Sequence, residues 1–156
     1  MKVDDFLNRR AVVTDLKSKD KEGVIREMVD LVAKAGDIRP KDKELLVKIL
    51  RERELLGSTG IGQGVGIPHA KSSSIKKLIG AVAISKEGVN FDSLDGEPAY
   101  IFFLLLAPQD SAGPHLKALA RISRLLKDKY FRDVLRNAQS GKELISLIVK
   151  EDQRRH

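Results

Sequence analysis

The sequence of 156 residues contains no cysteine and no tryptophan, and aromatic residues make up only 4% of it. Without cysteine there can be no disulfide, thiolate metal site or cysteine nucleophile, and nothing indicates an oxidising compartment. The low aromatic content leaves few rings to stack on nucleic-acid bases, since only Tyr130 and Phe131 accompany a basic segment. Any chemistry that the protein performs must therefore use other side chains.

Long apolar runs are also missing. The longest, from Ala99 to Ala107, is too short to span a bilayer. The amino-terminal segment, Met1 to Arg10, carries charges of both signs and no apolar run, so it does not resemble a secretory signal. We therefore expect a cytoplasmic protein with no direct membrane insertion.

Acidic residues are fewer than basic ones, which gives a formal net charge of +7. Clustered lysines and arginines would favour nucleic acid, because binding to a polyanion releases its counterions. Here the basic residues are interleaved with acidic ones, as in Lys41 to Glu44 and Arg51 to Glu54. This pattern favours a solvated charged surface over a nucleic-acid partner, although a positive field would also suit an acidic partner protein.

Apolar residues recur at helical spacing in five segments and run continuously in two others. Helices are predicted over 20–35, from Pro40 to Gly57, from Pro114 to Leu126, over 131–138, and after a capping box at Ser140 and Glu143. The continuous runs over 78–85 and 99–107 predict buried strands, whereas 57–74 shows neither period and is expected to form a loop. Together these elements predict an α/β fold, a single domain over 1–156 with a mixed β-sheet and helices on both faces.

The segment from Gly57 to Ser72 is rich in glycine and contains His69, and three phosphate-binding interpretations of it can be compared. A P-loop would require glycines where Ala70 and Val65 stand. A dinucleotide-binding fingerprint would require glycine at Val65 or at Ile67, according to where it starts. The remaining interpretation is that the glycines let the backbone approach His69 and present N–H groups to a phosphoryl group on its ring.

The imidazole of His69 suits this interpretation. A histidine with an ordinary pKa of about 6.5 is largely neutral at cytoplasmic pH, so one ring nitrogen keeps a lone pair that can attack phosphorus. The other nitrogen must then donate its hydrogen to a carbonyl or a hydroxyl. From spacing alone, His69 could equally pack in a glycine-rich turn without a chemical role.

A family resemblance bears on this choice. Arg53-Glu54 followed by Gly57 to His69 closely resembles the active-site signature of the enzyme IIA domains of the bacterial phosphotransferase system (PTS), in the fructose, mannitol and nitrogen-regulatory family. The resemblance extends to Phe91–Asp95, to Ala107-Pro108 and to His115–Leu119, and so covers nearly the whole chain. It identifies residues 1–156 as a single type-2 IIA domain.

The resemblance implies a phosphotransferase that needs no metal or cofactor. An HPr-like phosphocarrier protein would donate a phosphoryl group to Nε2 of His69, forming a transient phosphohistidine, and a IIB domain of a fructose- or mannitol-like transporter would accept it. Alternatively, a nitrogen-regulatory protein would control a regulatory target through the phosphorylation state of His69. The chain departs from the family at Gly66, where alanine is usual, and at Ala70 and Lys71, where glycine is common.

Further positions carry over from the family. Arg53 would supply the positive charge that phosphoryl transfer needs, and His115, which follows a proline predicted to start a helix, would be a neutral hydrogen-bond donor to the phosphoryl oxygens. Taken alone, a helix-end arginine and a helix-start histidine would more often be ordinary surface residues. Ser58, Thr59 and Gly64 are candidates for binding the phosphoryl group, although the two hydroxyls could equally form turns.

Overall fold

The computed structural model describes residues 1–155, so His156, to which the sequence assigns no role, lies outside the described residues. The strands are β1 (Leu7–Val13), β2 (Gly60–Gly62), β3 (Val65–Gly66), β4 (His69–Ser72), β5 (Ile79–Val89) and β6 (Ala99–Pro108). The α-helices are α1 (Lys21–Lys34), α2 (Lys43–Leu55), α3 (Ala112–Leu125), α4 (Lys129–Arg136) and α5 (Gly141–Arg155), and short 3-10 helices span Val3–Asp5 and Pro40–Asp42. Every predicted helix and both predicted strands are present, with boundaries shifted by a few residues.

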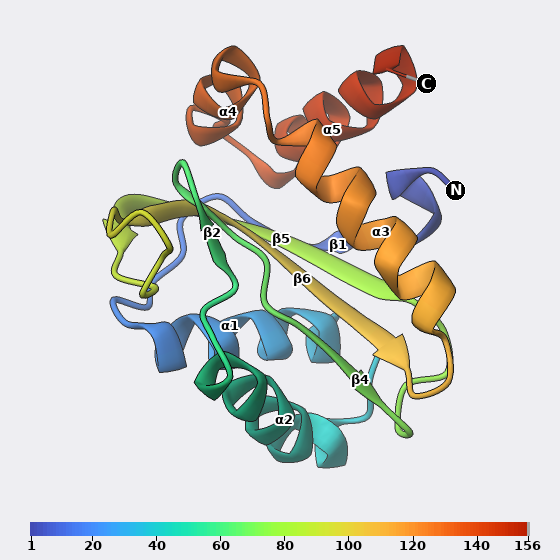
Figure 1. The fold of residues 1–156 in the computed structure, drawn as a ribbon. Helices are drawn as coiled ribbons and strands as arrows, with labels where there is room; N and C mark the ends of the chain where they lie inside the picture. Colours follow the sequence, from blue (N-terminus) through green and yellow to red (C-terminus); the bar gives the residue numbers. More distant parts are fainter. Residues whose placement is uncertain (156) are drawn as a thin grey trace.

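The strands form one mixed sheet with β5 and β6 at its centre (Figure 1). These two strands pair antiparallel, and β1 runs parallel to β5. On the other side of β6, β3 and β4 both run parallel to it, and β2 pairs antiparallel with β3. The predicted mixed sheet is therefore confirmed.

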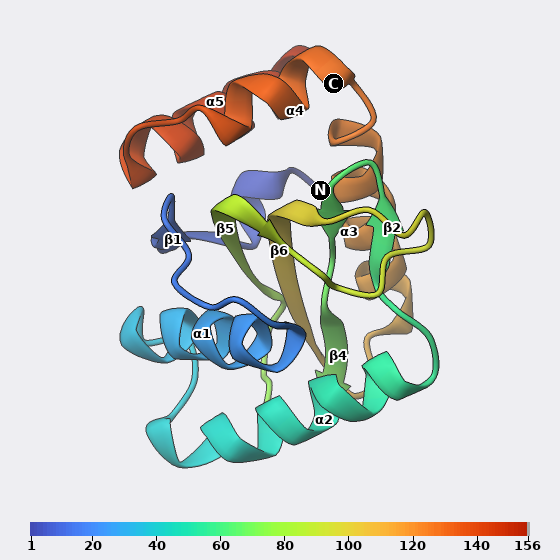
Figure 2. The same cartoon turned by 90° about the vertical axis from the view of Figure 1, so that its left-hand side faces the viewer.

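Helices cover both faces of the sheet, as predicted. α1 and α2 lie on one face, and α3, α4 and α5 lie on the other (Figure 1, Figure 2). Alternate side chains of β6 serve the two layers: Phe102 and Leu104 join the core of α1 and α2, whereas Phe103 and Leu105 join the core of the other helices. A strand that is buried on both faces has an almost continuous apolar sequence, which is why β6 is so clear in the sequence.

The prediction of a loop over 57–74 is wrong for half of its length, because this segment contains β2, β3 and β4. β3 and β4 pair with β6 in one continuous register, in which His69 lies opposite Leu105. Between them Pro68 has no N–H, but its carbonyl accepts a hydrogen bond from the N–H of Leu105 at 3.0 Å. Glycines carry no side chains, so they hide the alternation that would have indicated an edge strand.

Sequence patterns also failed to predict β1. Its buried residues Leu7 and Ala11 are separated by the exposed Arg9 and Arg10, so burial does not alternate along the strand. The register of β1 against β5 shifts within this stretch. A strand with an irregular register has no simple period in its sequence.

α3 begins earlier than predicted. Its first residue is Ala112, with Ser111 at the N-cap, so Pro114 is its third residue and His115 its fourth. Proline is tolerated at that position, because the first N–H groups of a helix have no partner within the helix. Leu116, the next residue of the helix, is 66% exposed although its side chain is apolar.

Candidate active site

A cleft of about 600 Å³ lies at the edge of the sheet beside β4. Its walls come from the last turns of α2, from β4 and from the start of α3. Arg53, His69 and His115 all line it. The structure therefore brings together the three residues that the family resemblance selects, although they lie far apart in the sequence.

β4 presents His69 to this cleft through the alternation of a strand. His69 and Lys71 are half-buried, whereas Ala70 and Ser72 between and after them are buried. Ala70 belongs to the core beneath α1 and α2. The side chains of His69 and Lys71 therefore share one side of the strand, and both line the cleft.

The ring of His69 is held by one hydrogen bond. Its Nδ1 lies 2.7 Å from the carbonyl oxygen of Ile67. A carbonyl can only accept, so Nδ1 carries the hydrogen and Nε2 keeps its lone pair. Burial lowers the pKa of His69 below its usual value, the hydrogen bond to Ile67 opposes this shift, and the charge of Arg53 adds to it. The net effect favours the neutral imidazole, which is the nucleophilic form.

His115 provides a second neutral imidazole. The two ring centroids are 5.5 Å apart with the planes at 67°. His115 is 7% exposed, and burial, followed by the charges of His69 and Lys71, lowers its pKa from 6.5 to about 4. Within residues 1–155 its Nε2 has no hydrogen-bond partner. A buried polar atom is normally hydrogen-bonded, so this ring is suited to an incoming polar group.

Arg53 lies near the end of α2 and is half-buried at the cleft rather than fully solvated. Its Nη1 donates to the carbonyl oxygen of Gly57 at 2.9 Å, which ties the guanidinium to the turn that follows the helix. A guanidinium has further N–H donors, and their fork geometry matches the oxygens of a phosphoryl group in the cleft.

Lys71 is a second cation at the cleft, at a position where the sequence indicated only a departure from the family. Its charge is close enough to lower the pKa of His115. If the segment had been predicted as a strand, the spacing of two residues would have placed Lys71 on the same side as His69. Lys71 therefore adds positive charge to a site that must hold an anion.

The structure places the other candidates differently. Ser58 Oγ donates to the carbonyl of Phe91 at 2.6 Å and accepts from the N–H of Gly60 at 2.9 Å. Thr59 is buried and its hydroxyl donates to Glu54. Both hydroxyls are therefore committed to bonds within the fold and not directed to His69.

Gly64 lies at the turn between β2 and β3, where its φ is +80°. Its carbonyl accepts from the N–H groups of Tyr100 and Ile101 at 2.8 and 3.0 Å. Ile101 is four residues before Leu105, the partner of His69, which corresponds to roughly 13 Å along a strand. The structure thus does not bring Gly64 to the cleft, and we leave it, Ser58 and Thr59 out of the direct phosphoryl contacts.

Two further properties of the described residues bear on function. Residues 1–155 contain no group of three or more His, Cys, Asp or Glu side chains arranged to hold a metal ion. Within the same range, no helix has the length and apolar character needed to cross a membrane.

A comparison with protein families decides what kind of domain contains this cleft. The family model described as the phosphoenolpyruvate-dependent sugar phosphotransferase system, EIIA 2, matches residues 5–151. The chain belongs to this family. As a IIA domain it is 36% identical over 148 residues to the nitrogen regulatory protein of Bradyrhizobium diazoefficiens, and the match covers 95% of each chain. It is 38% identical over 152 residues to the fructose-specific EIIABC component of Bacillus subtilis, of which it spans 24%.

Solved structures of IIA domains share this fold. The nitrogen regulatory protein IIA-Ntr of Neisseria meningitidis superposes with a TM-score of 0.83 and 31% identity, covering 92% of this chain and 97% of that one. Enzyme IIA for mannitol from Escherichia coli, in its complex with phosphorylated enzyme IIB, superposes with a TM-score of 0.75 and 20% identity, covering 90% and 95%. The predicted fold class is confirmed, and relatives of both the transport and the regulatory type fit the two predicted functions.

Proposed function

We propose that this IIA domain accepts a phosphoryl group on Nε2 of His69 from an HPr-like phosphocarrier protein and passes it to a IIB domain. The observation that carries the proposal is the hydrogen bond from Nδ1 of His69 to Ile67, which leaves Nε2 as the free nucleophile of a neutral ring beside the cleft. We place both exchanges in the cytoplasm, as the sequence led us to expect.

In the first exchange, the lone pair of Nε2 forms a bond to the phosphorus of the donor, in line with the bond that breaks. The electron pair of the broken bond stays on the donor. The new phosphohistidine keeps its Nδ1 hydrogen, which Ile67 continues to accept. In the second exchange an acceptor nucleophile attacks the same phosphorus, and the bonding pair returns to Nε2.

The charges around His69 suit this transfer. Phosphoryl transfer proceeds through a loose transition state whose charge lies on the equatorial oxygens, so catalysis consists mainly of positioning and positive charge. Arg53 and Lys71 would provide that charge, and a neutral His115 would donate one hydrogen bond without titrating near neutral pH. These groups account for the reaction with side chains of this domain alone.

The acceptor has two candidate identities. A IIB domain is the first, because IIA domains of this family pair with IIB domains, as in the mannitol complex. A regulatory target is the second, and the match to nitrogen regulatory proteins over 95% of each chain favours it specifically. In the regulatory case, roughly two added negative charges beside Arg53 would change the surface that the target contacts.

Incubation with enzyme I, HPr and phosphoenolpyruvate tests the first exchange. We expect one acid-labile phosphoryl group per chain, which His69→Ala abolishes and His115→Ala retains at a reduced rate of formation. Labelling that persists in His69→Ala would refute the assignment of the acceptor. If a IIB domain is then added, transfer of the label to its cysteine would favour a role in transport, and retention of the label on His69 would favour a regulatory role.

A further inference from the structure

Glu54 is a buried carboxylate next to the site. It follows Arg53 on α2, its side chain is 4% exposed, and it does not line the cleft that contains His69. It accepts from the N–H of Thr59 at 3.1 Å and from the Thr59 hydroxyl, and it pairs with Nζ of Lys21 at 2.9 Å. A buried charge is costly unless donors surround it, so these contacts fix Glu54 and Thr59 relative to each other.

A chain of hydrogen bonds runs from this carboxylate to the proposed nucleophile. The carbonyl of Thr59 accepts from the N–H of Ile67 at 3.0 Å. The carbonyl of Ile67 in turn accepts from Nδ1 of His69 at 2.7 Å. That last acceptor decides which ring nitrogen carries the hydrogen, and its own position depends on Thr59 and Glu54.

A second branch reaches Arg53. The N–H of Gly57 donates to the backbone carbonyl of Glu54 at 3.1 Å, and the carbonyl of Gly57 accepts from Nη1 of Arg53 at 2.9 Å. Glu54 thus holds the turn after α2 through Thr59, and the same turn holds the guanidinium of Arg53 through Gly57.

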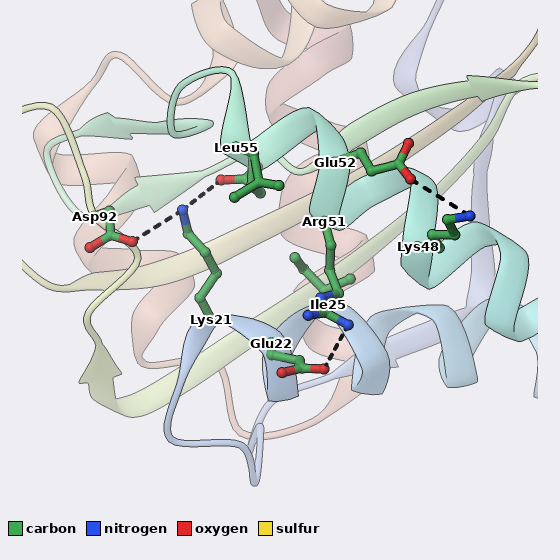
Figure 3. Close-up of a pocket in the computed structure, with 9 residues that line it drawn as sticks. Lys21, Glu22, Ile25, Lys48, Arg51, Glu52, Leu55 and Asp92 are labelled. Atoms are coloured by element: carbon green, nitrogen blue, oxygen red, sulfur yellow. Dashed lines mark ion pairs between the residues drawn. The ribbon is translucent and has the colours of Figure 1, made fainter.

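Lys21, the first residue of α1, also holds the carboxylate of Glu54. Its Nζ lies between Glu54 and Asp92, at 2.9 and 3.3 Å, in a hollow of about 510 Å³ between α1 and α2. Figure 3 shows Lys21 reaching from α1 toward Asp92 in this hollow. The other charged residues that line it are also ion-paired, Arg51 with Glu22 and Lys48 with Glu52. Within residues 1–155, each charged side chain of the hollow thus has an oppositely charged partner.

We propose that Glu54 is a positioning residue for phosphoryl transfer, which holds His69 in the tautomer with a free Nε2. It acts through the hydrogen-bond chain and touches no reacting atom. The inference rests on the proposed role of His69 as phosphoryl acceptor. Groups that orient a metal-binding histidine commonly change metal affinity or activity about 10- to 100-fold when they are removed, and we expect an effect of the same order here.

Three substitutions test the chain. Glu54→Gln preserves the shape of the side chain but removes its charge and one acceptor. Thr59→Val removes the hydroxyl, and Thr59→Ser retains it. Glu44→Gln is the matched control, because Glu44 lies on the same helix and pairs with Arg26 at 2.6 Å on the surface.

Two measurements are needed. Imidazole nitrogen NMR on the unphosphorylated protein reports the tautomer and pKa of His69, and transfer kinetics with an HPr-type donor report kcat and KM. For Glu54→Gln and Thr59→Val we expect a mixture of tautomers and a kcat lowered about 10- to 100-fold, with KM changed less than about two-fold. The pKa of His69 should also fall in Glu54→Gln, because the charge of Glu54 raises it. Thr59→Ser and Glu44→Gln should match the wild type.

An unchanged tautomer together with an unchanged kcat in folded Glu54→Gln and Thr59→Val would overturn the inference. If Glu54→Gln does not fold, the comparison of Thr59→Val with Thr59→Ser decides the question. The NMR measurement needs no phosphoryl donor. A wild-type protein that is not labelled on His69 would therefore refute the proposed function, while the tautomers of the variants would still decide whether Glu54 orients the ring.

Discussion

Replacing His115 with leucine is expected to make the protein more resistant to acid while slowing phosphoryl transfer. His115 is 7% exposed, and its Nε2 has no hydrogen-bond partner among residues 1–155. Burial, with the charges of His69 and Lys71, lowers its pKa from 6.5 to about 4. The ring is therefore neutral in the folded protein over a pH range in which the unfolded chain binds a proton.

The sign and size of the effect follow from this difference. Because the unfolded state is protonated first, the free energy of unfolding falls as the pH drops from 6.5 toward 4. One pKa unit corresponds to about 1.4 kcal/mol, so His115 would reduce the stability by about 3 kcal/mol at a pH of about 4. Above a pH of about 7 both states hold the ring neutral and the reduction disappears. Leucine does not titrate, so His115→Leu removes the effect.

Urea unfolding of the wild type and of His115→Leu at a pH of about 7 and of about 4 measures it. Carboxylates titrate alike in both proteins, so their contributions cancel in the comparison. We expect the difference in unfolding free energy to move by about 3 kcal/mol in favour of the variant between the two pH values. An equal difference at both values would refute the conclusion that burial keeps His115 neutral.

The same variant tests the proposed role of His115 in transfer. A hydrogen bond to a charged group contributes about 1.5–3 kcal/mol, so its loss should slow transfer about 10- to 150-fold. His115→Gln keeps an N–H donor and should retain more of the rate. A transfer rate that is unchanged in His115→Leu would remove His115 from the mechanism.

Substitutions at three other residues give separable outcomes. Arg53→Met should slow transfer by about 100-fold and Arg53→Lys by less, because lysine keeps the positive charge without the forked donors of the guanidinium. Rapid-quench measurements that give the two variants the same transfer rate would contradict this. Lys71→Gln should raise the pKa of His115, since the charge of Lys71 lowers it, and an NMR titration with no upward shift would contradict the assignment. Asp152 is 2% exposed and pairs with Arg121 at 2.7 Å. Asp152→Ala should lower the free energy of unfolding by about 3–5 kcal/mol, which urea unfolding measures. Transfer by the folded Asp152→Ala protein should stay near the wild-type rate, because this ion pair lies outside the cleft.

Elements with a regular local pattern were predictable. α1 shows an apolar face at helical spacing, and β6 shows an unbroken apolar run because both of its faces are covered. The capping box of α5 is partly realised: Ser140 Oγ accepts from the N–H of Glu143 at 3.1 Å, but the carboxylate of Glu143 accepts from Gln139 rather than from Ser140.

Elements whose form depends on a distant partner were not predictable. The glycine-rich segment becomes an edge strand only because β6 offers it a row of backbone partners, and its small residues show no alternation. Because β4 was predicted as a loop, the sequence did not show that His69 and Lys71 lie on the same side of a strand. Ser58 and Thr59 were candidates for binding the phosphoryl group or for forming turns, and a local pattern cannot show that their hydroxyls are bonded elsewhere in the fold.

By itself the sequence determined the family signature, with His69 as the candidate acceptor and Arg53 and His115 as its companions. Only the tertiary structure decided the state of these groups. The tautomer of His69 depends on the carbonyl of Ile67 and, through Thr59, on the buried carboxylate of Glu54. The low pKa of His115 depends on the layers that bury it. Hydrogen bonds and desolvation act over a few ångströms in space, so residues that are remote in sequence control them.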